Sequence, residues 1–139
     1  MKYIKNGNKY IVRIDKDEEV IEQIKKICND NCIKAGSITG LGAADRVKVG
    51  LFNTNTKEYL SKKLIGSFEI TSLIGNISRM NNEVYLHIHI GVSDENMNVY
   101  GGHLNHCYIS ATCELIIDEI EEDLNREFNE EIGLNLYSI

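Results

Sequence analysis

Three histidines in the second half of the chain have the residue type and the spacing of a metal-binding site. One residue separates His87 from His89, and His103 follows a Gly-Gly pair. Side chains alternate along a strand, so His87 and His89 point to the same face, with their Cα atoms about 6–7 Å apart. The two glycines allow the backbone to bend without a steric penalty, which can return His103 to the same place. The spacing therefore predicts three converging imidazoles that bind a divalent metal ion.

Zinc is the ion that this set of ligands favours. It is bound by neutral imidazole, and three protein ligands leave a fourth position for water or substrate. Iron is less favoured because no carboxylate completes an obvious group of two histidines and one carboxylate, although Glu69 stays open as a ligand. His106 is a further candidate that ranks below the other three histidines. The alternative is that the histidines form hydrogen bonds between strands or at a subunit boundary.

A metal held in this way would serve either catalysis or architecture. A catalytic ion lowers the pKa of its bound water toward ~7 and works with a nearby acid–base group. Glu69 and Glu114 are the candidates for that group, and the sequence places neither of them. Arg13 lies in an otherwise apolar segment, where it either pairs with Glu69 or Glu114 across a subunit interface or faces outward from its strand.

Charge and composition narrow the class of protein. The net charge is −6 over 139 residues and the basic residues are scattered, so the sequence shows no DNA-binding footprint, although folding can gather separate charges. No apolar run is long enough to span a membrane, and the N-terminus lacks the apolar segment of a signal peptide. We therefore expect a cytoplasmic protein with a single domain over residues 1–139 and no membrane partner. Its four cysteines are expected to be reduced, small, buried side chains, since none sits in a C-x-x-C pair.

The first part of the chain predicts a hairpin, a helix and a glycine-rich strand. Asn6-Gly7-Asn8 lies between apolar runs, which is a strong hairpin signal. Asp17 is the expected N-cap of a helix from Glu18 to Asn31 that has an apolar stripe at helical spacing. The segment from Ala35 to Ala44 matches neither the Walker pattern nor the dinucleotide fingerprint. It predicts strands in close backbone contact in preference to a phosphate-binding loop.

The rest of the chain predicts mainly strands. They cover residues 45–53, 58–64 at a sheet edge, 68–80, the histidine segment from Glu83, and 104–118. In the last of these, Ala111 shares one face with Cys107 and Cys113, and Asn81-Asn82 is the expected turn before the histidine segment. The tail from Glu119 to Ile139 allows a helix near Phe128 or a closing strand at 134–137. Together these elements predict an α+β fold, with a mixed, largely antiparallel sheet of about seven strands and one main helix.

Several of these segments together resemble the plants-and-prokaryotes-conserved (PPC) domain, in its single-domain prokaryotic form. The similarity extends from Arg13 to about Gly133. The paired-histidine strand followed by Gly-Gly-His-Leu is the most specific part. The segments that carry the resemblance are Arg13, Ser37–Ala43, Phe68–Ile70, Ser72-Leu73, Gly75–Ile77, Leu86–His89, Gly101–Leu104 and Ala111–Glu114.

The resemblance implies a homotrimer and a candidate DNA-binding or regulatory function. It also implies a metal site, because some prokaryotic members look metal-containing, with histidines at the positions of His87, His89 and His103. Plant members join this domain to a proline-containing AT-hook, and this chain has no proline. From the resemblance, the expected partner besides the chain itself is DNA or a partner protein. The alternative function is a zinc-dependent enzyme or a small-ligand-binding protein that acts at the same histidines.

Overall fold

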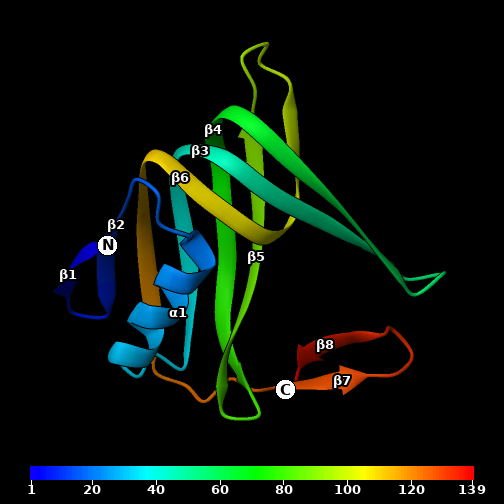
Figure 1. The fold of residues 1–139 in the computed structure, drawn as a ribbon. Coiled ribbons are helices and arrows are strands. Elements are labelled where there is room, and N and C mark those ends of the chain that lie inside the picture. The colour runs from blue at the N-terminus through cyan, green and yellow to red at the C-terminus, as the bar shows by residue number, and fades with distance from the viewer.

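The computed structural model describes residues 1–139 as eight strands and one helix. No helix has the length and apolarity that a membrane crossing requires. Figure 1 shows the single helix lying against one face of the curved strands. The strands are β1 (Lys2–Asn6), β2 (Lys9–Asp15), β3 (Ala35–Asn53), β4 (Glu58–Met80), β5 (Glu83–Ser93), β6 (Val99–Ile120), β7 (Arg126–Asn129) and β8 (Leu134–Tyr137), and the helix is α1 (Val20–Asp30).

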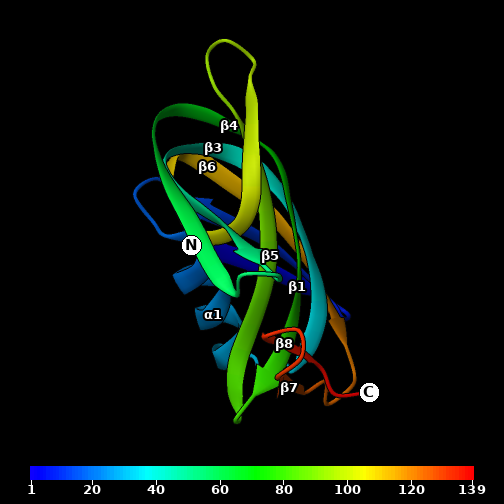
Figure 2. The ribbon, with the colours of Figure 1, turned by 90° about the vertical axis from the view of Figure 1, so that its right-hand side faces the viewer.

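Six strands form the main sheet in the order β1-β2-β6-β3-β4-β5. The start of β6 also pairs with β5, so β3, β4, β5 and β6 form a closed ring of pairings (Figure 2). The α+β prediction is confirmed, but the mixed sheet is wrong, because all of these strand pairs are antiparallel. The reason is that β6 lies between β2 and β3, so the two strands joined by α1 are parallel to each other without pairing.

The N-terminal hairpin is confirmed, whereas the start of the helix differs from the prediction. Gly7 has φ 60° in the turn between β1 and β2. The N-cap is Glu19, whose carboxylate accepts a hydrogen bond from the Glu22 backbone N–H at 2.8 Å. Asp17 has φ 68° and lies in the preceding turn, so it cannot serve as the cap. The other Glu19 oxygen accepts from the Cys107 backbone N–H, which ties the helix start to β6.

The core lies between α1 and the inner face of the sheet. Three of the four cysteines are buried there, as predicted, and burial raises the pKa of the Cys28 and Cys113 thiols to about 12. Cys32 is exposed, contrary to the prediction, because it follows the helix with φ 55°. Ala111 is also exposed, because β6 bends where its pairing with β3 is irregular. The three buried thiols are therefore unreactive packing groups.

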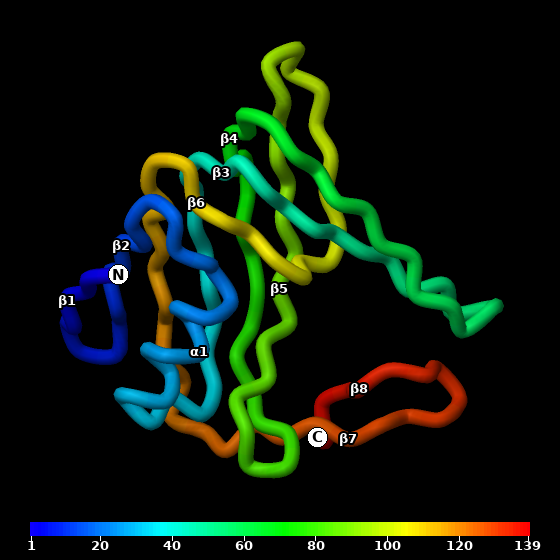
Figure 3. The backbone as a smooth tube through the Cα atoms, in the orientation of Figure 1, coloured from blue at the N-terminus to red at the C-terminus, as the bar shows by residue number.

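The strands predicted over 35–53 and 58–80 join into two long strands, β3 and β4. Gly50 is the last residue of β3 that pairs with β6. Beyond it, residues 51–60 continue as a hairpin of β3 and β4 alone, here called the β3–β4 arm (Figure 3). The glycine-rich segment is part of β3. A Cβ on Gly42, which has φ 158°, would lie 2.4 Å from the Thr112 carbonyl oxygen of β6. The predicted close backbone contact is therefore present, and the segment forms no phosphate-binding loop.

The tail forms a separate two-stranded sheet from β7 and β8. The helix near Phe128 is therefore wrong, and the strand at Leu134–Tyr137 is confirmed. This strand pairs with β7 and not with the main sheet. The turn at Asn81-Asn82 is also confirmed, with φ 53° and 66°.

Candidate metal centre

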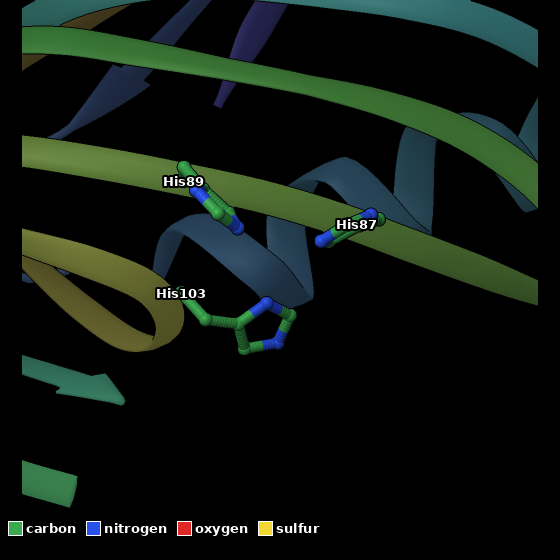
Figure 4. A group of neighbouring side chains, drawn as sticks. All are labelled: His87, His89 and His103. Atoms are coloured by element: carbon green, nitrogen blue, oxygen red, sulfur yellow. The ribbon is translucent and has the colours of Figure 1, made fainter. Parts of the chain in front are cut away.

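The pleat of β5 and the start of β6 bring the three histidines together. His87 and His89 share one face of β5, while the alternate residues Ile88 and Ile90 are buried in the core. His103 is the direct partner of His89 in the pairing of β5 with β6. Figure 4 shows the three rings facing one common space. The convergence follows from strand alternation and from the cross-strand register.

The ring geometry is close to that of a three-histidine metal site. The ring centroids of His87 and His89 are 5.1 Å apart, and His103 lies 5.4 Å from His87 and 5.8 Å from His89. One nitrogen from each ring lies within 4.8 Å of the others. Tetrahedral zinc needs nitrogen atoms about 3.3 Å apart, which follows from Zn–N distances of about 2.0–2.1 Å. The three nitrogens must therefore move closer together to hold one zinc ion.

The surroundings keep two of the rings in the form that binds metal. Burial lowers the pKa of His87 below its usual value of 6.5, and the charges of His103, His89 and Arg126 lower it further. Burial and the charge of His89 also lower the pKa of His103. Neutral imidazole has the free lone pair that a metal ion requires. His89 is exposed, so the centre is open to solvent on one side.

Tyr59 reaches this centre from the β3–β4 arm. Its ring meets the ring of His103 edge-on at a centroid distance of 6.3 Å, and its hydroxyl donates to Asn105 Oδ1 at 3.0 Å. The ring crosses β3 at Gly50, where a Cβ would lie 2.0 Å from the Tyr59 hydroxyl. Gly50 therefore leaves the space that lets Tyr59 contact His103. A glycine inside an alternating apolar strand was the one sequence signal for this crossing.

Arg126 anchors the C-terminal hairpin beside His87. Its guanidinium lies between the rings of Tyr85 and Tyr137, 4.8 Å and 4.2 Å from their centroids. It donates to Asn76 Oδ1, Ser78 Oγ and the Asn135 carbonyl oxygen, each at 2.8 Å. Asn76 is the strand partner of His87. No local sequence pattern indicates this contact, because it depends on how the tail docks.

The remaining candidates lie outside the cluster. Glu69 and Glu114 are exposed and are not among the side chains that converge with the three histidines. His106 is exposed on β6, where its strand partner is Lys48. Arg13 faces outward and bonds Asp15 Oδ1 through Nε at 2.8 Å, although its strand partner is Glu114. No hydrogen bond within the chain involves the imidazoles of the three clustered histidines.

The sequence pattern of one family covers most of the chain. Residues 1–121 match the Plants and Prokaryotes Conserved (PCC) domain, the family abbreviated PPC above. The chain belongs to this family. All three clustered histidines fall within the matched region of the PCC domain. No curated protein matches the sequence.

Solved structures of PCC-domain proteins agree with this fold. A candidate DNA-binding protein from Bacteroides thetaiotaomicron is 37% identical with a TM-score of 0.96, and the match covers 99% of this chain and 96% of that one. A PPC protein from Pyrococcus horikoshii is 30% identical with a TM-score of 0.87, covering 99% and 95%. A metal-containing protein from Archaeoglobus fulgidus is also 30% identical with a TM-score of 0.87, covering 96% and 94%.

Proposed function

We propose that this PCC-domain protein binds a divalent metal ion, most favourably zinc, through His87, His89 and His103. The observation that carries the proposal is the approach of three ring nitrogens to within 4.8 Å of one another. The lowered pKa values of His87 and His103 support it, because both rings are neutral near pH 7. The metal content of the Archaeoglobus relative, as its name describes it, is consistent with this assignment. Three nitrogen ligands favour zinc over magnesium or calcium, which prefer oxygen.

Elemental analysis of the untagged protein tests the metal site. The wild type and His106→Ala should each hold about one zinc per chain, since three protein ligands are enough for a zinc site with one open position. His87→Ala and His103→Ala should lose most of the metal. His106→Ala is the matched control, because His106 is exposed and lies outside the cluster. Equal metal content in all four proteins would end the proposal.

We further propose that the chain acts as a homotrimer, with residues 1–139 working as one domain. An exposed row of strand partners crosses the outer face of the sheet and supports self-association. Four isoleucines in the row are 49–67% exposed, and the row ends at His89 on β5. A second copy that covers this face would shield the row from water. The row consists of Ile4, Ile11, Ile116, Thr39 and Ile74.

The proposed role of the trimer is DNA binding or regulation in the cytoplasm, with DNA or a partner protein as its target. The support for this role is the similarity to the Bacteroides thetaiotaomicron protein, a candidate DNA-binding protein by name. The net charge of −6 means that contact must come from a local basic surface. Retention on duplex DNA should then fall steeply as salt is added, because phosphate contacts release counterions. No retention at low salt would refute DNA as the target and leave a partner protein.

The second candidate function is catalysis or small-ligand binding at the metal. The observation that favours it is the exposure of His89 beside only three protein ligands, which leaves a coordination position facing solvent. Glu69, Glu114 and Arg13 remain candidates for a supporting role under this proposal. Cobalt-substituted protein distinguishes the two functions. Azide should change its visible spectrum if the fourth position is open, and an unchanged spectrum would exclude this candidate.

A further inference from the structure

A second group of chemically active side chains lies at the base of the β3–β4 arm. The strand register places Lys63, Lys48 and His106 side by side on β4, β3 and β6. The adjacent row, two residues along β3, contains Ile65, Arg46 and Tyr108 in the same order. We call these six residues the basic grid. Four of the six carry or can carry a positive charge, in a chain whose net charge is −6.

The basic grid faces away from the core and lines a hollow. Val47 lies between Arg46 and Lys48 in the chain, Cys107 lies between His106 and Tyr108, and both are buried. Strand alternation therefore sends the side chains of the grid to the outer face. All six residues line a hollow of about 320 Å³. None of the three clustered histidines lines the hollow, although His103 lies on the same strand, β6.

The positive charges of the grid are mostly unpaired. Lys48, Lys63 and His106 have no ion pair within the chain, although Lys48 is half-buried. Arg46 bonds Asp45 Oδ1 through Nε at 3.0 Å and lies 4.4 Å from the centre of the Tyr108 ring. Like charges directly opposite one another destabilise a sheet. A protein usually keeps such a local conflict where function requires it.

We propose that the basic grid is a binding site for a phosphate group. Lysine ammonium groups and an arginine guanidinium are the standard protein partners of phosphate oxygens. Lys48, Lys63 and Arg46 all line the same hollow, and only the Nε of the Arg46 guanidinium is bonded within the chain. Tyr108 and Ile65 supply an aromatic and an apolar surface for the organic part of a phosphoester. The phosphate belongs either to a small phosphorylated molecule or to the backbone of DNA, and only the second source rests on the proposed DNA-binding role.

Titration with adenosine monophosphate, followed by NMR chemical shifts, tests the site in metal-free and zinc-loaded protein. The backbone signals of residues 46–48, 63–65 and 106–108 should shift, and adenosine without phosphate should leave them unchanged. The Lys48→Ala/Lys63→Ala variant should bind at least about tenfold more weakly, because it removes two charge-assisted contacts. The control is Lys2→Ala/Lys62→Ala, which removes the same charge from two exposed lysines without ion pairs. Lys62 lies next to Lys63 on β4, and strand alternation points its side chain to the opposite face.

Single charge reversal guards against a folding defect in the double variant. Lys63→Glu should abolish the shifts, and Lys62→Glu should retain them. Shifts that cluster at His87 and His103, or equal binding by Lys63→Glu and Lys62→Glu, would overturn the proposal.

Addition of a short DNA duplex identifies the source of the phosphate. Displacement of adenosine monophosphate supports a grid that contacts the DNA backbone, and unchanged binding supports a grid for small phosphoesters. A metal-free protein that still binds adenosine monophosphate shows that this site stands even where the zinc proposal fails.

Discussion

His87 and His103 make the stability of the metal-free protein depend on pH. Burial lowers the pKa of both side chains below the 6.5 that they have in the unfolded chain. The unfolded chain therefore takes up protons first as pH falls, which favours unfolding. The stability that the two neutral rings contribute is fully present above about pH 6.5 and decreases as pH falls through the lowered folded pKa values.

Urea unfolding of the metal-free protein measures this effect. The midpoint of the wild type should fall more steeply between about pH 7.5 and 5 than that of His87→Gln, which removes one of the two groups. His106→Gln, which lies outside the cluster, is the control and should follow the wild type. Parallel curves for the wild type and His87→Gln would show that His87 is not held neutral by the fold.

Tyr59 is expected to position His103 for the metal. Tyr59→Ala removes the ring that packs edge-on against His103 and should weaken zinc binding by about tenfold, as the loss of an orienting neighbour does in other zinc sites. Tyr59→Phe keeps the ring and loses only the hydrogen bond to Asn105, so its affinity should stay near that of the wild type. Competition with a chelating dye measures both affinities. Equal affinities for Tyr59→Ala and the wild type would remove Tyr59 from the site.

Single residues differ in how well the sequence predicted them. Strand alternation was sufficient to predict that His87 and His89 share a face. His103 joins them through the pairing of β5 with β6 after the turn at residues 94–98, and the predicted bend at the glycine pair is wrong, because Gly101 and Gly102 lie within that pairing. The contacts of Tyr59 and Arg126 could not be predicted, because they depend on the path of the arm and of the tail in three dimensions. The basic grid was hidden for the same reason, since Lys48, Lys63 and His106 are far apart in the sequence and meet only through strand register.

At the scale of elements, Arg126 fastens the β7–β8 hairpin to the main sheet. Arg126→Ala removes three hydrogen bonds and two ring contacts, which should cost about 2 kcal/mol of local stability. The amides of β7 and β8 should then exchange with solvent faster, while those of β3 and β6 keep their rates. Glu127→Ala, an exposed neighbour on the same strand, is the control. Unchanged exchange in Arg126→Ala would mean that other contacts hold the hairpin.

The elements themselves were predictable where the local signal was strong. Asn-Gly and Asn-Asn turns fixed two hairpins, because few residues adopt positive φ without strain. The helix start was missed because the buried Glu19 carboxylate bonds β6 as well as the helix, which no local pattern reveals. Strands β3 and β4 were predicted in pieces, because glycines and bulges interrupt an alternation that the fold continues. The tail was ambiguous because its apolar residues fit both helical and strand periods.

At the scale of the whole molecule, the exposed isoleucine row predicts where copies of the chain meet. Ile11→Asp and Ile74→Asp each place a charge within that row and should convert a trimer to monomers, because a buried unpaired charge is strongly unfavourable. Ile139→Asp changes a fully exposed isoleucine outside the row and should leave the trimer intact. Light scattering coupled to gel filtration measures the mass. A trimer that survives both row substitutions would place the contact elsewhere.

A crystal structure with anomalous scattering would locate a metal ion held by the three clustered histidines. Data collected on either side of the zinc absorption edge should give one peak per chain, between the rings of His87, His89 and His103. The expected peak lies about 2.0–2.1 Å from one nitrogen of each ring, with a fourth position open to solvent. An empty space between the three rings in zinc-loaded crystals, or a peak located only at His106, would contradict the claim.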